Sequence, residues 1–437
     1  MDAAPPAAAD GQLIRAIGTL GLAASIVNIT IGGGIFRVPG SPAVSGALGA
    51  AAPLAYVACA ALMGLIVMCI AQAGRRVSLT GGPYAYVEHT FGRYAGFLVG
   101  VMLWLIGATA VPAVATIFAD AAGHMVPALN GAAGRAAFLF AMLGIVTWVN
   151  ILGVKQGTRV NIVFTAGKLI PLLLLLVAGI FAVKTTNFHV VANAGGAQSF
   201  ARACVILIFI FAGVETALVP SGEVRDPART VPRAVFLAMC AVTLIYIGLQ
   251  VVAQGVLGSS LVGNGTPLAS AAEGVFGSWG GTMIATGLLV SAFGYLSGML
   301  LATPRALYAF GRDGILPRQL AAVHPRYRTP WVAIIAQALI AWILAVTSRF
   351  ETLLIIANVS AALIYLGCAA AAWKLQRDSP SALGTAVPLL ATLGILALLS
   401  SVTLQEWSVL AIVLVAATLL YLPTMRARSR EQPAPAR

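Results

Sequence analysis

The residues best suited to chemistry in this sequence lie where apolar segments are interrupted by small residues. The first interruption is a run of glycines between isoleucines, consisting of Ile31, Gly32, Gly33, Gly34 and Ile35. Each glycine costs a helix about 1 kcal/mol relative to alanine. Backbone N–H groups freed at such a break can hold a carboxylate, and freed carbonyl groups can hold an ammonium. The sequence therefore predicts a binding site for a small molecule, built from backbone atoms.

A second interruption lies five apolar segments further along the chain. It consists of the run Phe211, Ala212, Gly213, Val214, Glu215 and Thr216, which Pro220 and Gly222 follow. Paired breaks in corresponding segments indicate an inverted-repeat transporter whose substrate site lies between them. The alternative is that the small residues only let helices pack closely. Phe209, two residues before the second break, is expected either to gate the site or to pack in the core.

Two ionisable side chains, Lys168 and Glu215, stand inside apolar segments. A charge within a membrane is costly, so such residues are functional candidates by default. Lys168 lies about 13 Å along a helix from Arg159, and Glu215 about 12 Å from Glu223. This similar depth predicts a shared layer in which either group could carry a coupling proton. Snorkelling of Lys168 and a fixed hydrogen-bonded role for Glu215 are the alternatives.

The elements that must position these residues are membrane-spanning helices. The 437 residues are 60% hydrophobic and 9% charged, whereas soluble domains are about 25% charged. We predict an all-α integral membrane protein with 12 transmembrane helices. The expected spans are 16–45, 49–73, 84–119, 134–153, 160–183, 200–221, 233–257, 279–311, 331–347, 352–374, 383–401 and 406–424.

The distribution of basic residues predicts the orientation. Of the 26 Lys and Arg residues, 20 fall on one set of alternate loops and five on the other, with Lys168 inside a span. The positive-inside rule then places both termini in the cytoplasm of a multi-pass protein of the inner cell membrane. The net charge of +13 reflects this imbalance and does not indicate nucleic-acid binding. Residues 1–14 and 425–437 are expected to be cytoplasmic tails of one transmembrane domain, 15–424.

Four motifs in order resemble the amino acid–polyamine–organocation superfamily, in particular its bacterial amino acid permeases and antiporters. The run from Gly32 to Phe36 is similar to the first-helix G-x-G-[IV]-F motif, and Gly81 to Tyr86 to the segment before the third helix. Gly222 to Ala234 resembles the loop after the sixth helix, and Arg312 to Gly314 with Pro317 resembles the end of the eighth.

The resemblance implies a five-plus-five inverted repeat of the LeuT-like type with two extra C-terminal helices. The repeats would span about 15–183 and 200–376, and the extra helices about 383–424. It further implies alternating access to a small amine-bearing acid. Lys168 would replace the sodium site in sodium-independent members, and Glu215 matches a Glu of the antiporter branch. Gly33 stands where the family often has Ser, so one hydroxyl for the carboxylate is missing.

The leading functional prediction is sodium-independent secondary transport of amino acids, by proton coupling or exchange. The first alternative is a basic amino acid or polyamine antiporter, favoured by Glu215 and disfavoured because span 3 offers Trp104, Ile106, Gly107 and Thr109 but no carboxylate. A membrane-embedded enzyme would need converging catalytic groups that the spans lack, and a channel would not need paired breaks.

We expect no metal and no cofactor. The expected partners are an amino acid, protons if transport is coupled to them, and the lipid bilayer. The sequence carries no signal for an oligomeric state.

Overall fold

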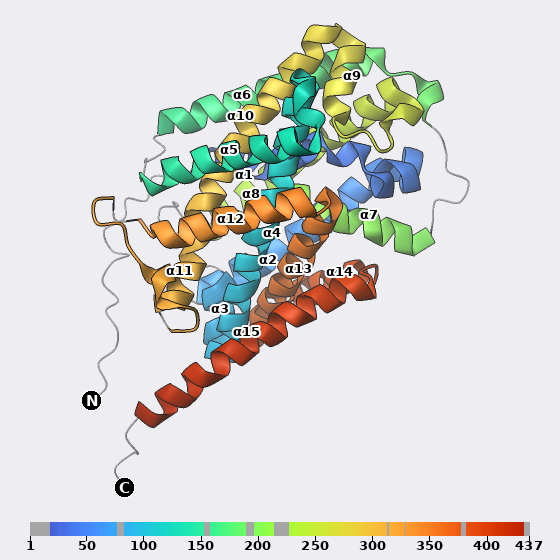
Figure 1. Ribbon diagram of the computed structural model, residues 1–437. Helices are drawn as coiled ribbons and strands as arrows, with labels where there is room; N and C mark the ends of the chain where they lie inside the picture. Colours follow the sequence, from blue (N-terminus) through green and yellow to red (C-terminus); the bar gives the residue numbers. More distant parts are fainter. Residues whose placement is uncertain are drawn as a thin grey trace.

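The computed structural model describes residues 18–76, 83–152, 158–188, 196–213, 227–312, 314–327, 329–376 and 382–431. Within these ranges the chain is helical and contains no β-strand, which confirms the predicted all-α class. Figure 1 shows the helices packed into one bundle. The α-helices are α1 (Thr19–Thr30), α2 (Ala52–Arg76), α3 (Pro83–Phe91), α4 (Arg93–Met125), α5 (Ala132–Ile151), α6 (Thr158–Gly179), α7 (Gly196–Phe211), α8 (Pro227–Leu257), α9 (Pro267–Phe276), α10 (Ser278–Ala302), α11 (Pro304–Arg312), α12 (Trp331–Thr347), α13 (Phe350–Leu375), α14 (Ala382–Leu399) and α15 (Leu404–Glu431).

Seven of the described helical segments are long and apolar enough to cross a membrane, and four shorter helices of 10–17 residues are also apolar. The most apolar stretches of α4 and α13 are 72% buried inside the protein, whereas that of α15 is only 11% buried. Helices α4 and α13 therefore form the interior, and α15 presents leucine and valine side chains outward, as a lipid-facing helix does. The predicted total of twelve spans stays a prediction.

Two predicted spans are each divided in two. The span 84–119 separates into α3 and α4 at Gly92, whose φ of 89° is a left-handed conformation that only glycine adopts readily. Gly92 ends α3, and Gly96 lets α4 pass close to Glu88. The span 279–311 separates into α10 and α11 at Thr303, because Pro304 has no N–H to continue the helical hydrogen bonds. The boundary at Gly92 corrects the sequence-based prediction, whereas Ser278–Arg312 as a whole is still one segment long and apolar enough to cross a membrane.

Two further differences concern helices that extend beyond the predicted spans. Helix α9 forms in the connection between α8 and α10, which the sequence treats as a loop. Helix α15 continues to Glu431, so part of the predicted C-terminal tail, 425–437, is helical. In Figure 1, α15 crosses the lower edge of the bundle as the red helix.

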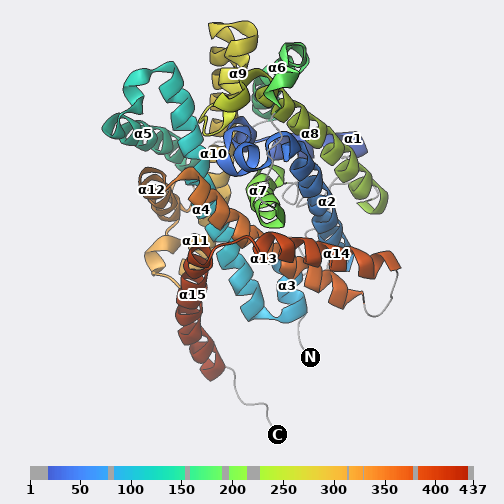
Figure 2. The same ribbon diagram turned by 90° about the vertical axis from the view of Figure 1, so that its right-hand side faces the viewer.

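Helix α7 runs inward from one side of the bundle (Figure 1). Viewed as in Figure 2, α2 and α8 lie on one side of it and α4 on the other, with α13 below. Helix α7 packs directly on α2 and α13 and contacts the irregular segment that follows α1. Its last two turns are almost entirely buried, from Ala203 to Phe211. The centre of the molecule is thus where one of the predicted breaks falls.

The helix ends separate into two groups, as the alternation of loops requires. At one end Arg37 and Arg135 both pair with Asp120. At the other end Lys374 Nζ donates to the carbonyl oxygen of Thr90 at 3.0 Å, and Gln376 donates to Gln72 at 2.7 Å. Residues that the charge distribution assigns to the same side of the membrane therefore lie together.

Candidate substrate site at two helix breaks

The first break lies where the glycine run predicts it. Helix α1 ends at Thr30, Ile31 donates its N–H to Val27 O at 3.0 Å, and Gly32 is extended with φ −99° and ψ −160°. A 3₁₀ turn, Gly33–Phe36, then begins. Its first N–H groups, those of Gly33 and Gly34, have no carbonyl within the turn to bond. The break therefore provides backbone donors at a buried position.

The second break begins at the end of α7. Ala212 still donates to Ile208 O at 3.0 Å, and Gly213 then takes a φ of 107°, which would strain any other residue. Residues 214–226, including Glu215, lie outside the described residues, so the predicted proximity of Glu215 to Lys168 stays a prediction.

The two breaks lie against each other. A Cβ atom added to Gly34 would stand 2.9 Å from side-chain carbons of both Phe209 and Ile210 on α7. Cβ atoms essentially never approach other carbon atoms so closely, so a side chain at residue 34 would displace Phe209 and Ile210. Phe209 keeps some accessible surface, whereas Ile210 is 2% exposed.

Tyr246 of α8 joins the ends of the two broken helices. Its buried hydroxyl lies 3.0 Å from Thr30 O, at the end of α1, and 2.9 Å from Ile210 O, at the end of α7. Phe211 packs edge-on against the Tyr246 ring, with the centroids 5.3 Å apart. Since the hydroxyl carries a single hydrogen, it can fully satisfy only one of the two carbonyls at a time.

Among the described residues, the side chains nearest to Gly32 and Gly33 carry no charge. A Cβ atom at Gly33 would lie 3.4 Å from Val114 of α4 and 3.7 Å from Leu288 of α10, and one at Gly32 would lie 4.0 Å from the Tyr295 ring. Ile31, Ile35 and Phe211 are fully buried. Of the predicted site residues, Gly32, Phe209, Ala212 and Gly213 keep accessible surface. The backbone, more than the isoleucine side chains, is therefore what the site offers.

Lys168 is buried on α6, with 8% of its surface exposed. Helix α6 touches α10 almost backbone to backbone here, because a Cβ atom at Gly287 would lie 3.1 Å from Gly167 O, and one at Gly167 would lie 3.0 Å from Val290. This close packing keeps the lysine within the protein and argues against snorkelling to the membrane surface. Its role in coupling stays a prediction.

An ion cluster, which we call the Asp120 cluster, includes Arg37, the residue that directly follows the 3₁₀ turn of the first break. It consists of Arg37, Asp120, Arg135 and Phe350: both arginines pair with Asp120, and the Arg37 guanidinium lies 4.7 Å from the centre of the Phe350 ring. Close by, Ser41 Oγ donates to Glu351 at 3.1 Å. The cluster connects the segment after the first break to α4, α5 and α13.

Two glutamines of α8 hold the same segment from the other side. Gln250 donates to Ser45 Oγ at 2.8 Å and accepts from the Tyr56 hydroxyl at 2.8 Å. One helical turn later, Gln254 donates to Gly49 O at 2.6 Å. These contacts supply partners for backbone and side-chain groups that an irregular buried segment would otherwise leave unsatisfied.

Sequence reasoning did not identify Tyr246 or the Asp120 cluster. A signal for Tyr246 was available, since a tyrosine in the middle of an apolar span needs a partner for its hydroxyl. The pairing of Arg37 and Arg135 with Asp120 had no such signal, because these residues lie on different segments.

A helical membrane protein with two interrupted helices that meet at a buried position has the architecture of a secondary transporter. The comparison with known proteins gives the family. The profile of the amino acid permease family matches residues 17–426, and the chain belongs to this family of transporters; it is not an enzyme.

Several characterised relatives carry amino acids according to their names. The serine/threonine exchanger SteT of Bacillus subtilis (strain 168) is 30% identical over 371 residues, which cover 82% of each chain. The branched-chain amino acid permease BcaP of the same organism is 26% identical over 346 residues, 75% of this chain and 74% of the relative. The human large neutral amino acids transporter small subunit 2 is 28% identical over 377 residues, 81% of this chain and 69% of the relative. The family and these relatives support amino acid transport, with an amino acid as the small-molecule substrate.

Proposed function

We propose that this protein transports neutral amino acids across the inner cell membrane by alternating access, without sodium, and by exchange or proton symport. The observation that carries the proposal is the contact between the two breaks, where Gly34 lies against Phe209 and Ile210. Both termini would be cytoplasmic, as the distribution of basic residues predicts.

The backbone at the breaks suits both charged groups of an amino acid. The first N–H groups of the 3₁₀ turn, at Gly33 and Gly34, would hold the carboxylate, since a helical start carries partial positive charge. The carbonyls at the ends of α1 and α7, near Thr30 and Ile210, carry partial negative charge and would hold the ammonium. The one hydrogen of the Tyr246 hydroxyl is shared by Thr30 O and Ile210 O, and Thr30 O also accepts from the N–H of Gly32 at 2.8 Å.

A neutral side chain fits the surroundings of the first break. Val114, Leu288 and Tyr295 lie next to the glycines, and none of them carries a negative charge that would pair with a cationic side chain. The names of the relatives agree, since they include serine/threonine, branched-chain and large neutral amino acids. Lys168 would supply the positive charge that sodium supplies in other transporters, and Lys168 and Glu215 are the residues proposed to carry a coupling proton.

The test is uptake into proteoliposomes. Radiolabelled leucine and serine would be presented in sodium or choline buffer, with and without unlabelled amino acid inside. We expect equal uptake in the two buffers, stimulation by internal amino acid if the protein exchanges, and competition by neutral amino acids. Competition by arginine or spermidine and not by leucine or serine would instead establish the basic amino acid or polyamine antiporter. A flux that does not saturate with substrate concentration would indicate a channel.

A further inference from the structure

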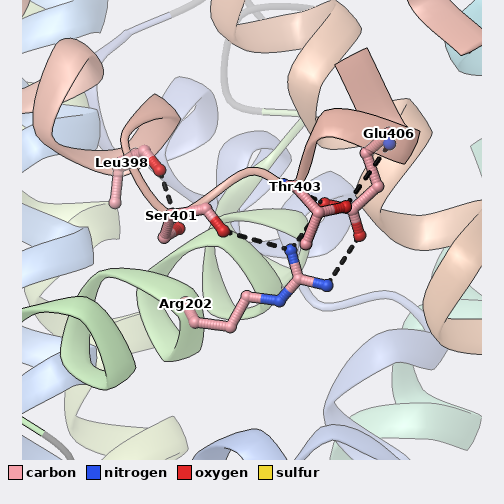
Figure 3. Close-up of polar contacts among 5 residues, drawn as sticks. All are labelled: Arg202, Leu398, Ser401, Thr403 and Glu406. Carbon is pink, nitrogen blue, oxygen red and sulfur yellow. Dashed lines mark hydrogen bonds and ion pairs between the residues drawn. The ribbon is translucent and has the colours of Figure 1, made fainter. Parts of the chain in front are cut away.

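A bidentate ion pair connects the central broken helix to the last two helices. Arg202 of α7 donates through Nη1 to Glu406 Oε2 at 2.7 Å and through Nη2 to Glu406 Oε1 at 2.6 Å. Arg202 Nη1 also lies 3.5 Å from Ser401 O, in the turn between α14 and α15. Figure 3 shows the guanidinium reaching from α7 into this turn. Parallel charge-assisted hydrogen bonds of this kind fix orientation as well as distance.

The turn that Arg202 contacts, between α14 and α15, has hydrogen bonds of its own. Glu406 accepts from the N–H of Thr403 at 2.8 Å, and the Glu406 N–H lies 3.4 Å from Thr403 Oγ1, which forms a capping box at the start of α15. Ser401 Oγ donates to Leu398 O at 2.8 Å. The Glu406 carboxylate is therefore held by the backbone of its own turn as well as by the guanidinium, and its side chain is only 13% exposed.

The pair acts on the helix that forms one wall of the proposed site. Arg202 precedes Phe209 by seven residues, about 10 Å along a helix, and Phe209 lies against Gly34. Because both residues lie on α7, an ion pair that fixes the helix at Arg202 also restricts where Phe209 lies along and around the helix axis. A second polar contact, from Asn358 of α13 to Val205 O at 2.6 Å, supports the same helix from another side.

We propose that Arg202 and Glu406 are positioning residues through which α14 and α15 set the placement of α7 in the substrate site. This gives the two helices outside the five-plus-five repeat a function in transport. The inference rests on the proposed function, because its effect on substrate is transmitted through the contact of Phe209 with Gly34.

The test compares Arg202→Gln, Glu406→Gln and the double variant with two controls. Arg349→Gln removes an exposed arginine from the loop before α13, and Thr403→Ala weakens the α15 cap but leaves the ion pair in place. We expect KM for leucine to rise about fivefold in both single variants with Vmax nearly unchanged, since removing a charge-assisted pair shifts equilibria by factors of this order. The KM of the double variant should be no higher than that of the single variants. Arg202→Lys should have a lower KM than Arg202→Gln, and both controls should have the KM of the parent protein.

A second measurement uses the native cysteines and needs no substrate. Cys204 is buried on α7, with its Sγ 3.9 Å from Ala55 O of α2, while Cys69 and Cys368 are buried elsewhere. In Arg202→Gln, maleimide labelling followed by mass spectrometry should show Cys204 reacting several-fold faster, with Cys69 and Cys368 unchanged.

Faster labelling of all three cysteines with lower Vmax and unchanged KM would mean that the pair only stabilises the fold, and it would overturn the proposal. An unchanged KM with unchanged Cys204 labelling would overturn it as well. If the parent protein takes up no neutral amino acid, the proposed function fails, and the labelling of Cys204 still decides whether the pair places α7.

Discussion

The two helix breaks lie side by side but are held in place by different means. The segment after the first break is attached on several sides: Arg37 pairs with Asp120, Ser41 bonds Glu351, and Gln250 and Gln254 of α8 hold Ser45 and Gly49. All these partners belong to helices within the predicted repeats.

The helix before the second break is attached differently. Helix α7 has apolar packing and accepts hydrogen bonds from Asn358 and Tyr246, and at its far end it is also held by Arg202, whose partner Glu406 begins α15. The first break is thus held by helices within the predicted repeats, whereas the helix before the second break has an additional attachment to α15, one of the two helices predicted to lie outside the repeats. The predictions below test the contact between the breaks first and then each attachment.

The largest effect is expected from closing the space between the breaks. Gly34→Leu should abolish substrate binding and uptake, because even a Cβ atom there would lie 2.9 Å from Phe209 and Ile210. Binding is measured by calorimetry on the purified protein and uptake in proteoliposomes. Gly64→Leu on α2, where nothing lies within 4 Å of the added Cβ, is the matched control. Unchanged affinity in Gly34→Leu would remove the first break from the site.

The next effect concerns Lys168, which is buried on α6 and is proposed to take the place of a sodium ion. Lys168→Ala should lose net uptake, because the positive charge that Lys168 is proposed to supply to the first break would be gone. Net uptake and counterflow are compared in sodium and choline buffers, with Lys184→Ala, an exposed lysine after α6, as control. Full net uptake in Lys168→Ala, or a steep sodium dependence of the parent, would contradict this role.

Removing the hydroxyl shared by the two breaks should have a smaller effect. Tyr246→Phe keeps the ring against Phe211 but leaves Thr30 O and Ile210 O without its hydrogen bond. We expect KM for substrate to rise about tenfold, in line with about 1.4 kcal/mol for a buried hydrogen bond. Tyr56→Phe removes the same atom from a tyrosine whose hydroxyl donates to Gln250 and not to a carbonyl at the end of α1 or α7. Equal KM values in the two variants would show that the hydroxyl of Tyr246 has no particular role in binding.

The smallest effect is expected at the Asp120 cluster and should appear in stability. Asp120→Asn leaves Arg37 and Arg135 without their shared carboxylate. Because all three side chains are partly exposed, we expect the free energy of unfolding to fall by only about 1–2 kcal/mol. Thermal unfolding in detergent measures this. Arg135→Gln, which keeps the Arg37–Asp120 pair, should lose less, and the reverse order would mean that Arg37 is not the arginine that the carboxylate holds.

Sequence alone determined the class of protein and the positions of the breaks. Long apolar stretches with few charges require membrane helices, and three consecutive glycines cannot sustain a helix, so α1 ends at Thr30 as expected. Gly213 likewise marks the end of α7. These properties are local, because hydropathy and backbone freedom depend on the residues of a single segment. The family resemblance rested on the same local motifs and agrees with the match over residues 17–426.

The tertiary structure decided which distant residues meet. Tyr246 bonds Thr30 across 216 positions, Arg202 bonds Glu406 across 204, and one aspartate serves two arginines from different segments. Such pairs depend on the height, rotation and tilt of each helix, which are set by side-chain packing over the whole bundle. Even the division of a predicted span at Gly92 required a left-handed backbone, which glycine permits and which the packing of α3 against α4 selects.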